Sequence, residues 1–325
     1  MKQRFPKRYI TSCILILFSS ISMAQNLKVT LLGTGIPVPS IERFGPSVLV
    51  EAGTQKFLFD CGRGAAQRLW QLKVPLGQIN AMFLTHLHSD HVVGIPDVLL
   101  TGMIPAIYGR RESPLKTWGP TGTKEMMEYL QKAFIWDIRT RSKEKNKADI
   151  DILAETTEIS EGIVFNKEGV KITAFLVDHA EFIDSALGYR IDYGGHSVVI
   201  SGDTRYSENL IKFAKGADVI IHEVALADKE STQNSTVVRQ ILGLHTSPED
   251  AGKVFEQVRP KLAVYTHIAF LTANPSIPLP TVNDLAQRTK TTFTGAVQVG
   301  EDLMSIEIGD EVKVSKYSPP NNKPN

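Results

Sequence analysis

A seven-residue block rich in histidine constrains this chain more than any other feature. The block reads THLHSDH over residues 85–91 and directly follows the apolar run at residues 81–84. Three imidazoles and a carboxylate beside a buried strand each need a partner, and a metal ion supplies one. Nitrogen and carboxylate donors without a thiolate are typical of zinc in an open catalytic site. The candidate ligands in the block are His86, His88, Asp90 and His91.

Further polar residues follow apolar runs later in the chain. They are His179, Asp203, the pair His222-Glu223, and His267. A lone histidine after a strand is more often a hydrogen-bonded structural residue than a metal ligand. A series of polar ends on apolar strands is different, because active sites built on sheets are assembled from such ends. We therefore expect these residues to approach the histidine block.

Short β-rich runs alternate with helical signals along the chain. Strands are expected at residues 27–32, 47–51, 56–59, 80–84, 170–177, 186–192, 197–201, 219–221 and 262–266. Helices are expected at residues 64–72, 123–134, 207–214 and 247–257. Hairpins in the first half and strand–helix alternation in the second are typical of sheets covered by helices on their outer faces. The polar stretch at residues 139–149 predicts a solvated loop, and residues 317–325 predict a disordered tail.

The first 24 residues have the pattern of a secretory signal peptide. Four basic residues precede an apolar stretch, and Ser22-Met23-Ala24 is a small-x-small cleavage pattern. The apolar stretch is too short to span a bilayer, which needs about 20 residues. We therefore expect a periplasmic or secreted protein without membrane attachment after cleavage.

Charge and cysteine content narrow the expected partners. Cleavage after Ala24 would leave 32 basic and 35 acidic residues, a formal charge of −3, and one cysteine, Cys61. That charge weighs against nucleic acid as the main partner, because binding to it depends on neutralising phosphates. A single thiol excludes an intramolecular disulfide in the mature chain.

Taken together, the motifs resemble those of metallo-β-lactamase-fold hydrolases, in the branch that holds ribonuclease Z and the zinc-dependent type III arylsulfatases. The resemblance implies an α/β fold over residues 25–316, an αββα sandwich of two mixed sheets with helices on the outer faces. The matching segments are LLGTG (31–35), FDCG (59–62), the histidine block, Asp178-His179, GYR (188–190), SGDT (201–204), His222-Glu223, HTS (245–247) and Thr266-His267.

The resemblance also implies a ligand set and catalytic roles. One Zn²⁺ ion would be held by His86, His88 and His179, and a second by Asp90, His91 and His267, with Asp203 and a hydroxide bridging the two. His245 would act as a general acid or oxyanion stabiliser, Glu223 would fix its tautomer, and Asp90 is counted with them as catalytic. Asp60 would orient a ligand loop, and Arg43 would either contact a substrate anion or form a structural ion pair. The resemblance also allows a homodimer.

Substrate class rests on weaker signals. We expect an exported enzyme that cleaves a small-molecule sulfate ester, as the type III arylsulfatases do, because no basic Gly/Pro-rich arm for tRNA is visible between the metal motifs. Phosphodiester hydrolysis is the near alternative, since sulfuryl and phosphoryl groups share tetrahedral geometry. Lactone or β-lactam hydrolysis is a third reading. A scaffold that keeps zinc for structure alone is disfavoured, because all seven ligand positions are filled.

Overall fold

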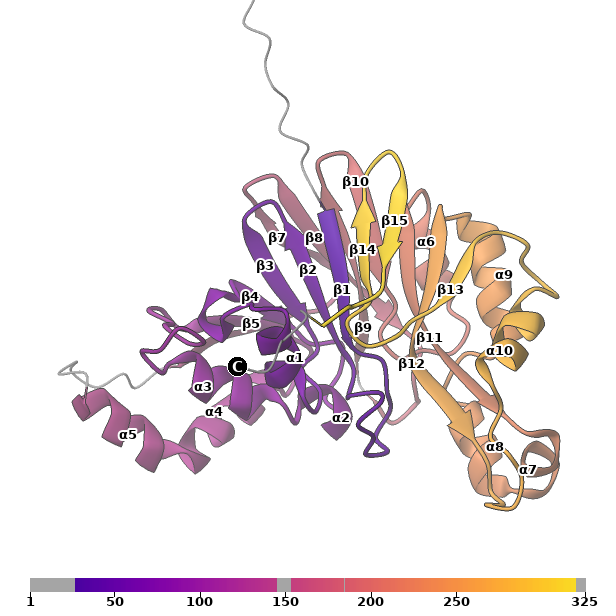
Figure 1. Ribbon diagram of the computed structural model, residues 1–325, viewed down its shortest axis with the longest axis horizontal. Helices are drawn as coiled ribbons and strands as arrows, with labels where there is room; N and C mark the ends of the chain where they lie inside the picture. The colour runs from indigo at the N-terminus through magenta and orange to yellow at the C-terminus, as the bar shows by residue number, and fades with distance from the viewer. Residues whose placement is uncertain (1–26, 145–152, 184, 320–325) are drawn as a thin grey trace, which may run out of the picture.

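Two mixed β-sheets face each other in the computed structural model, which describes residues 27–144, 153–183 and 185–319. The first sheet has the strand order β15-β14-β1-β2-β3-β4-β5-β6, and the second has the order β13-β12-β11-β10-β9-β8-β7 (Figure 1). The strands of the first sheet are β1 Leu27–Gly33, β2 Ser47–Ala52, β3 Gln55–Phe59, β4 Ala81–Phe83, β5 Leu115–Gly119, β6 Ala154–Glu158, β14 Ser305–Ile308 and β15 Val312–Ser315. Those of the second are β7 Gly162–Lys167, β8 Val170–Val177, β9 Ala186–Tyr193, β10 His196–Ile200, β11 Val219–Ala227, β12 Leu262–Leu271 and β13 Val297–Val299.

Helices cover the outer face of each sheet. The first half of the chain contributes α1 Ala65–Gln71, the 3₁₀ helix Leu76–Gln78, α2 Ser89–Val92, α3 Ile95–Gly102, α4 Thr123–Ala133 and α5 Ile135–Glu144. The second half contributes α6 Glu208–Ala214, α7 Lys229–Asn234, α8 Thr236–Leu242, α9 Pro248–Val258 and α10 Val282–Thr289. Helices α1, α3 and α4 pack on the first sheet, and α6, α9 and α10 pack on the second. The expected αββα sandwich is confirmed.

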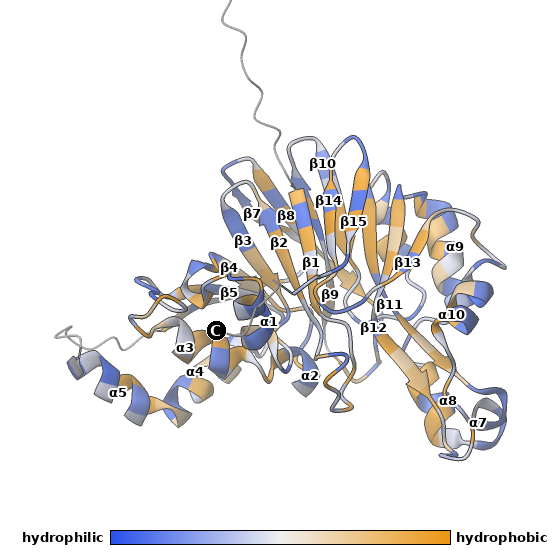
Figure 2. Ribbon diagram, viewed as in Figure 1, coloured by the Kyte–Doolittle hydropathy of each residue, from blue (hydrophilic) through white to orange (hydrophobic). Residues whose placement is uncertain are grey.

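Alternation along the strands explains the layered core. On β3, Phe57 and Phe59 face the opposite sheet, while Leu58 faces the helices. Strand β11 repeats the pattern, with Val219 and Ile221 inward and Ile220 outward. Strands buried on both faces read as continuous apolar runs, and Figure 2 shows them as orange ribbons inside a bluer shell.

Two expectations differ from the structure. The stretch 139–149 was expected as a solvated loop, but α5 extends to Glu144. That helix forms because Ile138 and Ser142 are buried and Arg141 pairs with Asp137 one turn earlier. Strands β11 and β12 also continue past their expected ends at residues 221 and 266, because their pairing resumes after an irregularity. His222, Glu223 and His267 therefore lie within strands rather than after them.

Other expectations fall outside the described residues. The signal peptide over residues 1–24 lies there, as do residues 145–149 of the polar stretch and residues 320–325 of the tail. Within the described part of the tail, the Tyr317 hydroxyl donates to the Gln71 carbonyl over 3.4 Å. None of the helices in the described ranges is long and apolar enough to cross a membrane.

Strand direction brings distant segments of the chain to one edge. Strands β10, β11 and β12 are parallel, and β8 runs in the same direction because it is antiparallel to β9, which is antiparallel to β10. Their carboxyl ends therefore lie at one end of the second sheet, in the lower part of Figure 1, where β11 and β12 extend toward α8. Residues that follow these strands share this end with the segment that follows β4.

Replacement of Phe83 by alanine should lower the free energy of unfolding by about 3–5 kcal/mol, because it removes a fully buried ring. This ring stacks between Phe59 and Trp118, with both centroid distances at 5.1 Å. Denaturant unfolding of the full chain measures the change. Ile163→Ala, at an exposed edge-strand position, is the control and should shift the value by less than about 0.5 kcal/mol. Equal losses in the two variants would contradict this description of the core.

Candidate metal centre

All seven candidate ligands meet near the carboxyl ends of these strands. Each comes from a strand end or from the short helix α2, apart from one that lies within a strand. His86 and His88 follow β4, Asp90 and His91 lie on α2, His179 follows β8, Asp203 follows β10, and His267 lies within β12. Six of them are buried, and His88 is exposed. The centre therefore opens to solvent on the side of His88.

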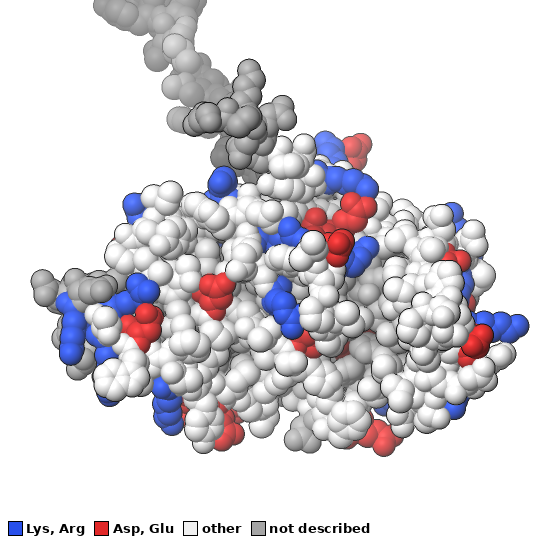
Figure 3. All heavy atoms as spheres, turned by 60° about the horizontal axis from the view of Figure 1, so that its bottom comes forward, with Lys and Arg blue, Asp and Glu red and all other residues white. Residues whose placement is uncertain are grey.

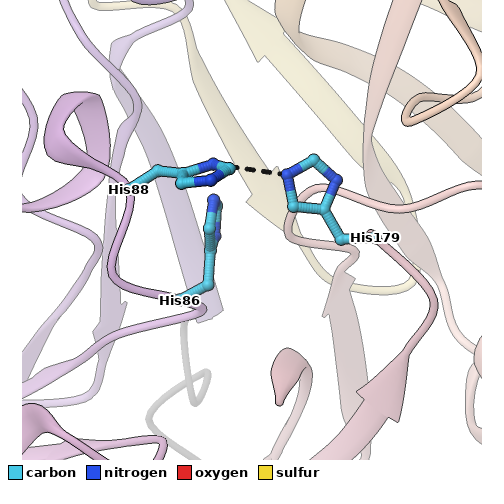
Figure 4. Close-up of side chains that lie close together, drawn as sticks. All are labelled: His86, His88 and His179. Carbon is cyan, nitrogen blue, oxygen red and sulfur yellow. Dashed lines mark hydrogen bonds between the residues drawn. The ribbon is translucent and has the colours of Figure 1, made fainter. Parts of the chain in front are cut away.

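The first group of three histidines surrounds one point. His86 and His88 come from one segment, and His179 faces them from the opposite side (Figure 4). The Nε2 atom of His179 lies 3.4 Å from Nδ1 of His88. One ligand atom from each of the three residues lies within 4.8 Å of the other two, a spacing that suits a shared cation.

Asp203 connects this group to a second one, which is formed by Asp90, His91 and His267. Its Oδ2 atom lies 3.9 Å from Nε2 of His86 and 3.9 Å from Nε2 of His179. The same oxygen lies 3.4 Å from Nε2 of His91 and 3.3 Å from Nε2 of His267. Asp90 completes the second group, with its Oδ2 atom 3.4 Å from Nε2 of His267. The carboxylate of Asp203 thus lies between two sets of donors.

The donor atoms fit divalent cations. Nε2 of His86, Nε2 of His91 and Oδ1 of Asp203 are buried and have no hydrogen-bond partner within the described chain. Leaving several buried polar atoms without partners is costly unless something else satisfies them. Imidazole nitrogens and carboxylate oxygens without thiolates suit zinc and related divalent metals.

Hydrogen bonds at Nδ1 direct the Nε2 atoms inward. His91 Nδ1 lies 2.8 Å from Asp60 Oδ2, and His179 Nδ1 lies 2.9 Å from the Leu244 carbonyl. Both partners are acceptors, so Nδ1 carries the proton and Nε2 keeps its lone pair. His86 follows the same rule, because the Thr85 hydroxyl donates to Asp60 and can only accept from His86 Nδ1, 3.0 Å away. Such bonds fix the tautomer and orientation of ligating histidines.

Asp60 is the hub of this arrangement. Its carboxylate accepts from the Thr85 amide at 2.8 Å, the Thr85 hydroxyl at 2.8 Å and His91 Nδ1. Without a bound cation, burial lowers the pKa of His91, but the carboxylates of Asp203 and Asp60 outweigh it and hold that pKa well above its usual value, so a cation at Nε2 would displace a proton. Asp60 has a left-handed backbone with φ 55°, a conformation that aspartate adopts more readily than most residues.

A bulge between β11 and β12 positions two more residues. Pairing is regular up to His222 with Tyr265 and resumes at Val224 with Ile268, so Glu223 lies opposite two residues of β12. One of those two is His267, whose φ is 42°. Bulges re-aim side chains, and here the irregularity turns His267 toward Asp90 and Asp203.

Glu223 holds His245 beside the centre. Its Oε2 atom lies 3.2 Å from His245 Nδ1, and its Oε1 atom accepts the Thr246 amide at 2.7 Å. Burial opposes protonation, but the Glu223 carboxylate raises the pKa of His245 to about 9. The His245 ring lies 5.2 Å from the His179 ring and 5.4 Å from the His267 ring, by centroids. The His245 ring therefore lies within the cluster of candidate ligands.

The remaining candidates have structural contacts. His222 is buried, bonds to the Glu223 carbonyl and packs against Phe255. Arg43 donates to the Thr34 hydroxyl and the Gly300 carbonyl, so it holds its loop against two other segments of the chain.

Sequence reasoning did not single out Thr246, whose hydroxyl donates to the Thr204 carbonyl over 2.6 Å and so joins the His245 loop to the Asp203 loop. Its place directly after His245 was the available signal.

Comparison with known proteins identifies the family. Residues 27–251 match the family model of the anti-Pycsar protein Apyc1. The ribonuclease Z of Mycolicibacterium gilvum (strain PYR-GCK) is 35% identical over 282 residues, which cover 87% of this chain and 96% of that protein. The chain belongs to the Apyc1 family and is a metallo-β-lactamase-fold hydrolase related to ribonuclease Z.

Solved structures share the fold of this hydrolase. The metallo-β-lactamase-fold protein YhfI from Bacillus subtilis is 20% identical with a TM-score of 0.67, and the alignment covers 87% of this chain and 99% of YhfI. The short form of human tRNase Z (ELAC1) is 24% identical with a TM-score of 0.59, covering 86% of this chain and 98% of that one. At these identities the likeness establishes the fold alone.

The relationship corrects the expected partner. The prediction of a small-molecule ester substrate, with nucleic acid disfavoured as a partner, was wrong, because the curated relatives are named as ribonucleases. The argument from a net charge of −3 failed because net charge does not describe a site. A phosphodiester can be recognised locally by a metal centre, without an excess of basic residues over the whole chain. The phosphodiesterase alternative also agrees with the relationship better than the arylsulfatase reading does.

Replacement of Asp60 by asparagine should weaken metal binding about 10- to 100-fold, because the change removes a carboxylate that supports a ligating histidine. An amide group at Oδ2 would meet two donors, His91 Nδ1 and the Thr85 hydroxyl. Competition with a chromogenic chelator measures the dissociation constant. Asp97→Asn on α3, where the carboxylate accepts from Thr101 at the surface, is the matched control. An unchanged dissociation constant in Asp60→Asn would refute the role of this carboxylate.

Proposed function

We propose that this hydrolase is a zinc-dependent phosphodiesterase that cleaves RNA. The observation that carries the proposal is the gathering of seven ligand-type side chains beside the His245–Glu223 pair, in a chain 35% identical to a ribonuclease Z. We assign one zinc ion to His86, His88 and His179 and a second to Asp90, His91 and His267. Asp203 lies within reach of both groups.

The cations and the protein have separate tasks in this proposal. Bound cations would supply Lewis acidity toward phosphoryl oxygens and lower the pKa of water toward about 7. The protein orients the donors, since Asp60, Thr85 and the Leu244 carbonyl fix three imidazole rings. It also keeps the centre largely buried, which strengthens electrostatic interactions there.

His245 completes the reaction in this proposal. Water would lose a proton to solvent and attack phosphorus, and the bond from phosphorus to the leaving oxygen would break. That oxygen would take the proton from Nε2 of His245, which would then regain a proton from solvent. Glu223 holds the opposite ring nitrogen at 3.2 Å and compensates the positive charge that the ring carries before transfer. The electron pair of the broken bond stays on the leaving oxygen, so protonation matters most for poor leaving groups.

The surface around the centre suits local recognition of phosphate. Figure 3 turns the lower edge of Figure 1 forward and shows Lys and Arg interspersed with Asp and Glu, separated by wide uncharged areas. Affinity for RNA would then depend on the metal centre more than on a broad basic surface on this face. Salt should therefore weaken RNA binding less steeply than for a protein that contacts many phosphates.

The first test compares substrates on the zinc-loaded full chain. Bis(4-nitrophenyl) phosphate and a short RNA should be hydrolysed, and 4-nitrophenyl sulfate should be a much poorer substrate. His88→Ala should lose both activity and bound zinc, because it removes a donor from the first group. Faster turnover of the sulfate ester than of either phosphodiester would reject the proposal.

The second test addresses proton donation. His245→Ala should keep its zinc and lose about 10²- to 10⁴-fold in kcat toward phosphodiesters with poor leaving groups, which depend most on a general acid. The loss should shrink as the pKa of the leaving group falls. His196→Ala is the control and should keep full activity, because His196 begins β10 away from the centre, where its Nδ1 atom lies 3.9 Å from Oδ2 of Asp218. A loss independent of leaving-group pKa would assign His245 another role.

A further inference from the structure

An exposed aromatic side chain lies on the loop that follows His179. Phe182 is 76% exposed, three residues beyond that candidate ligand. The Ile183 amide donates to the Ala180 carbonyl over 3.1 Å, so residues 180–183 form a turn with Phe182 at one corner. Ala180 is buried, and His179 is held by the Leu244 carbonyl. The base of the turn is therefore fixed, while the ring faces solvent.

This turn begins directly after a ligand of the first group. In the first ligand group, His86 and His179 are buried and His88 is exposed, and His88 Nδ1 lies 3.4 Å from His179 Nε2. Three residues of chain span at most about 10 Å, which limits how far Phe182 can lie from the α-carbon of His179. A base attached to a phosphate at the centre thus has an aromatic ring within reach.

The charges of the same loop are partly compensated. Asp178 would repel an anionic substrate, but Nη2 of Arg205 pairs with its Oδ1 atom at 2.5 Å, and the Arg205 amide donates to the Asp178 carbonyl at 2.7 Å. Glu181 lies at the other corner of the turn and also faces solvent. Both carboxylates are negative and would not attract a phosphate, so the favourable contact that residues 178–183 offer to a nucleotide is the ring of Phe182.

We propose that Phe182 is a specificity residue, a platform on which a nucleobase of the substrate stacks while the adjoining phosphate lies at the metal centre. This inference rests on the proposed phosphodiesterase function. Stacking on an aromatic ring accepts any base, because every base has a π-face. The platform would favour nucleotides over other phosphate esters without selecting a sequence.

The test compares two ligands that differ only in the base. Adenosine 5′-monophosphate and ribose 5-phosphate carry the same phosphate on the same sugar, and calorimetry on the zinc-loaded full chain gives both dissociation constants. The wild-type chain should bind the nucleotide about tenfold more tightly, as expected for one stacked base. Phe182→Ala should bring the ratio close to one without changing the affinity for ribose 5-phosphate. Phe182→Trp should keep the ratio.

Trp136→Ala is the matched control, because that ring on α5 is 78% exposed and lies outside the metal-centre loops. It should leave both constants unchanged. An unchanged ratio in Phe182→Ala would overturn the proposal, as would equal weakening of both ligands, which would give the ring a structural role. A lower molar mass of Phe182→Ala in sedimentation with an unchanged ratio would assign Phe182 to a contact between copies. Failure of the wild-type chain to hydrolyse RNA, with the ratio intact, would reject the phosphodiesterase function and leave the base platform standing.

Discussion

The site depends on hydrogen bonds that hold the Nδ1 atoms of three of its histidines and direct their Nε2 atoms toward the metal centre. His86, His91 and His179 each meet a different partner, namely a hydroxyl, a carboxylate and a backbone carbonyl. Each partner fixes one tautomer and one ring orientation. The lone pairs then converge around the carboxylate of Asp203, which four imidazoles approach within 3.9 Å. Without these bonds, neither the tautomer nor the ring orientation of the three histidines would be fixed.

The two packed sheets provide the stability that this convergence of polar side chains requires. Apolar side chains on both faces of β3, β4 and β11 stabilise a rigid double layer, and the loops at one edge carry the polar groups. Beside these loops, Asp60 and His267 have left-handed backbones, as Lys73, Arg110, Glu168, Arg259 and Leu303 do elsewhere in the described chain. Non-glycine residues in this conformation cost about 1–2 kcal/mol each, and such strain is tolerated where the surrounding packing dictates the conformation.

The layered arrangement of sheets and helices could be predicted from the sequence alone, and so could the presence of the histidine block in the site. Continuous apolar runs predict doubly buried strands, and polar residues after them predict a site at the strand ends. The bulge at Glu223 and His267 could not be predicted, because it depends on pairing between strands about 40 residues apart in sequence. Helix α5 was missed because its charged residues outnumber its apolar ones, although Ile138 is buried. The partner was missed because net charge says nothing about where phosphate binds.

The most direct test of the account is anomalous X-ray diffraction from zinc-loaded crystals, measured on both sides of the zinc absorption edge. We expect two anomalous peaks, one among His86, His88 and His179 and one among Asp90, His91 and His267, with Asp203 contacting both. A single peak, or zinc bound elsewhere while these imidazoles stay without metal, would contradict the account.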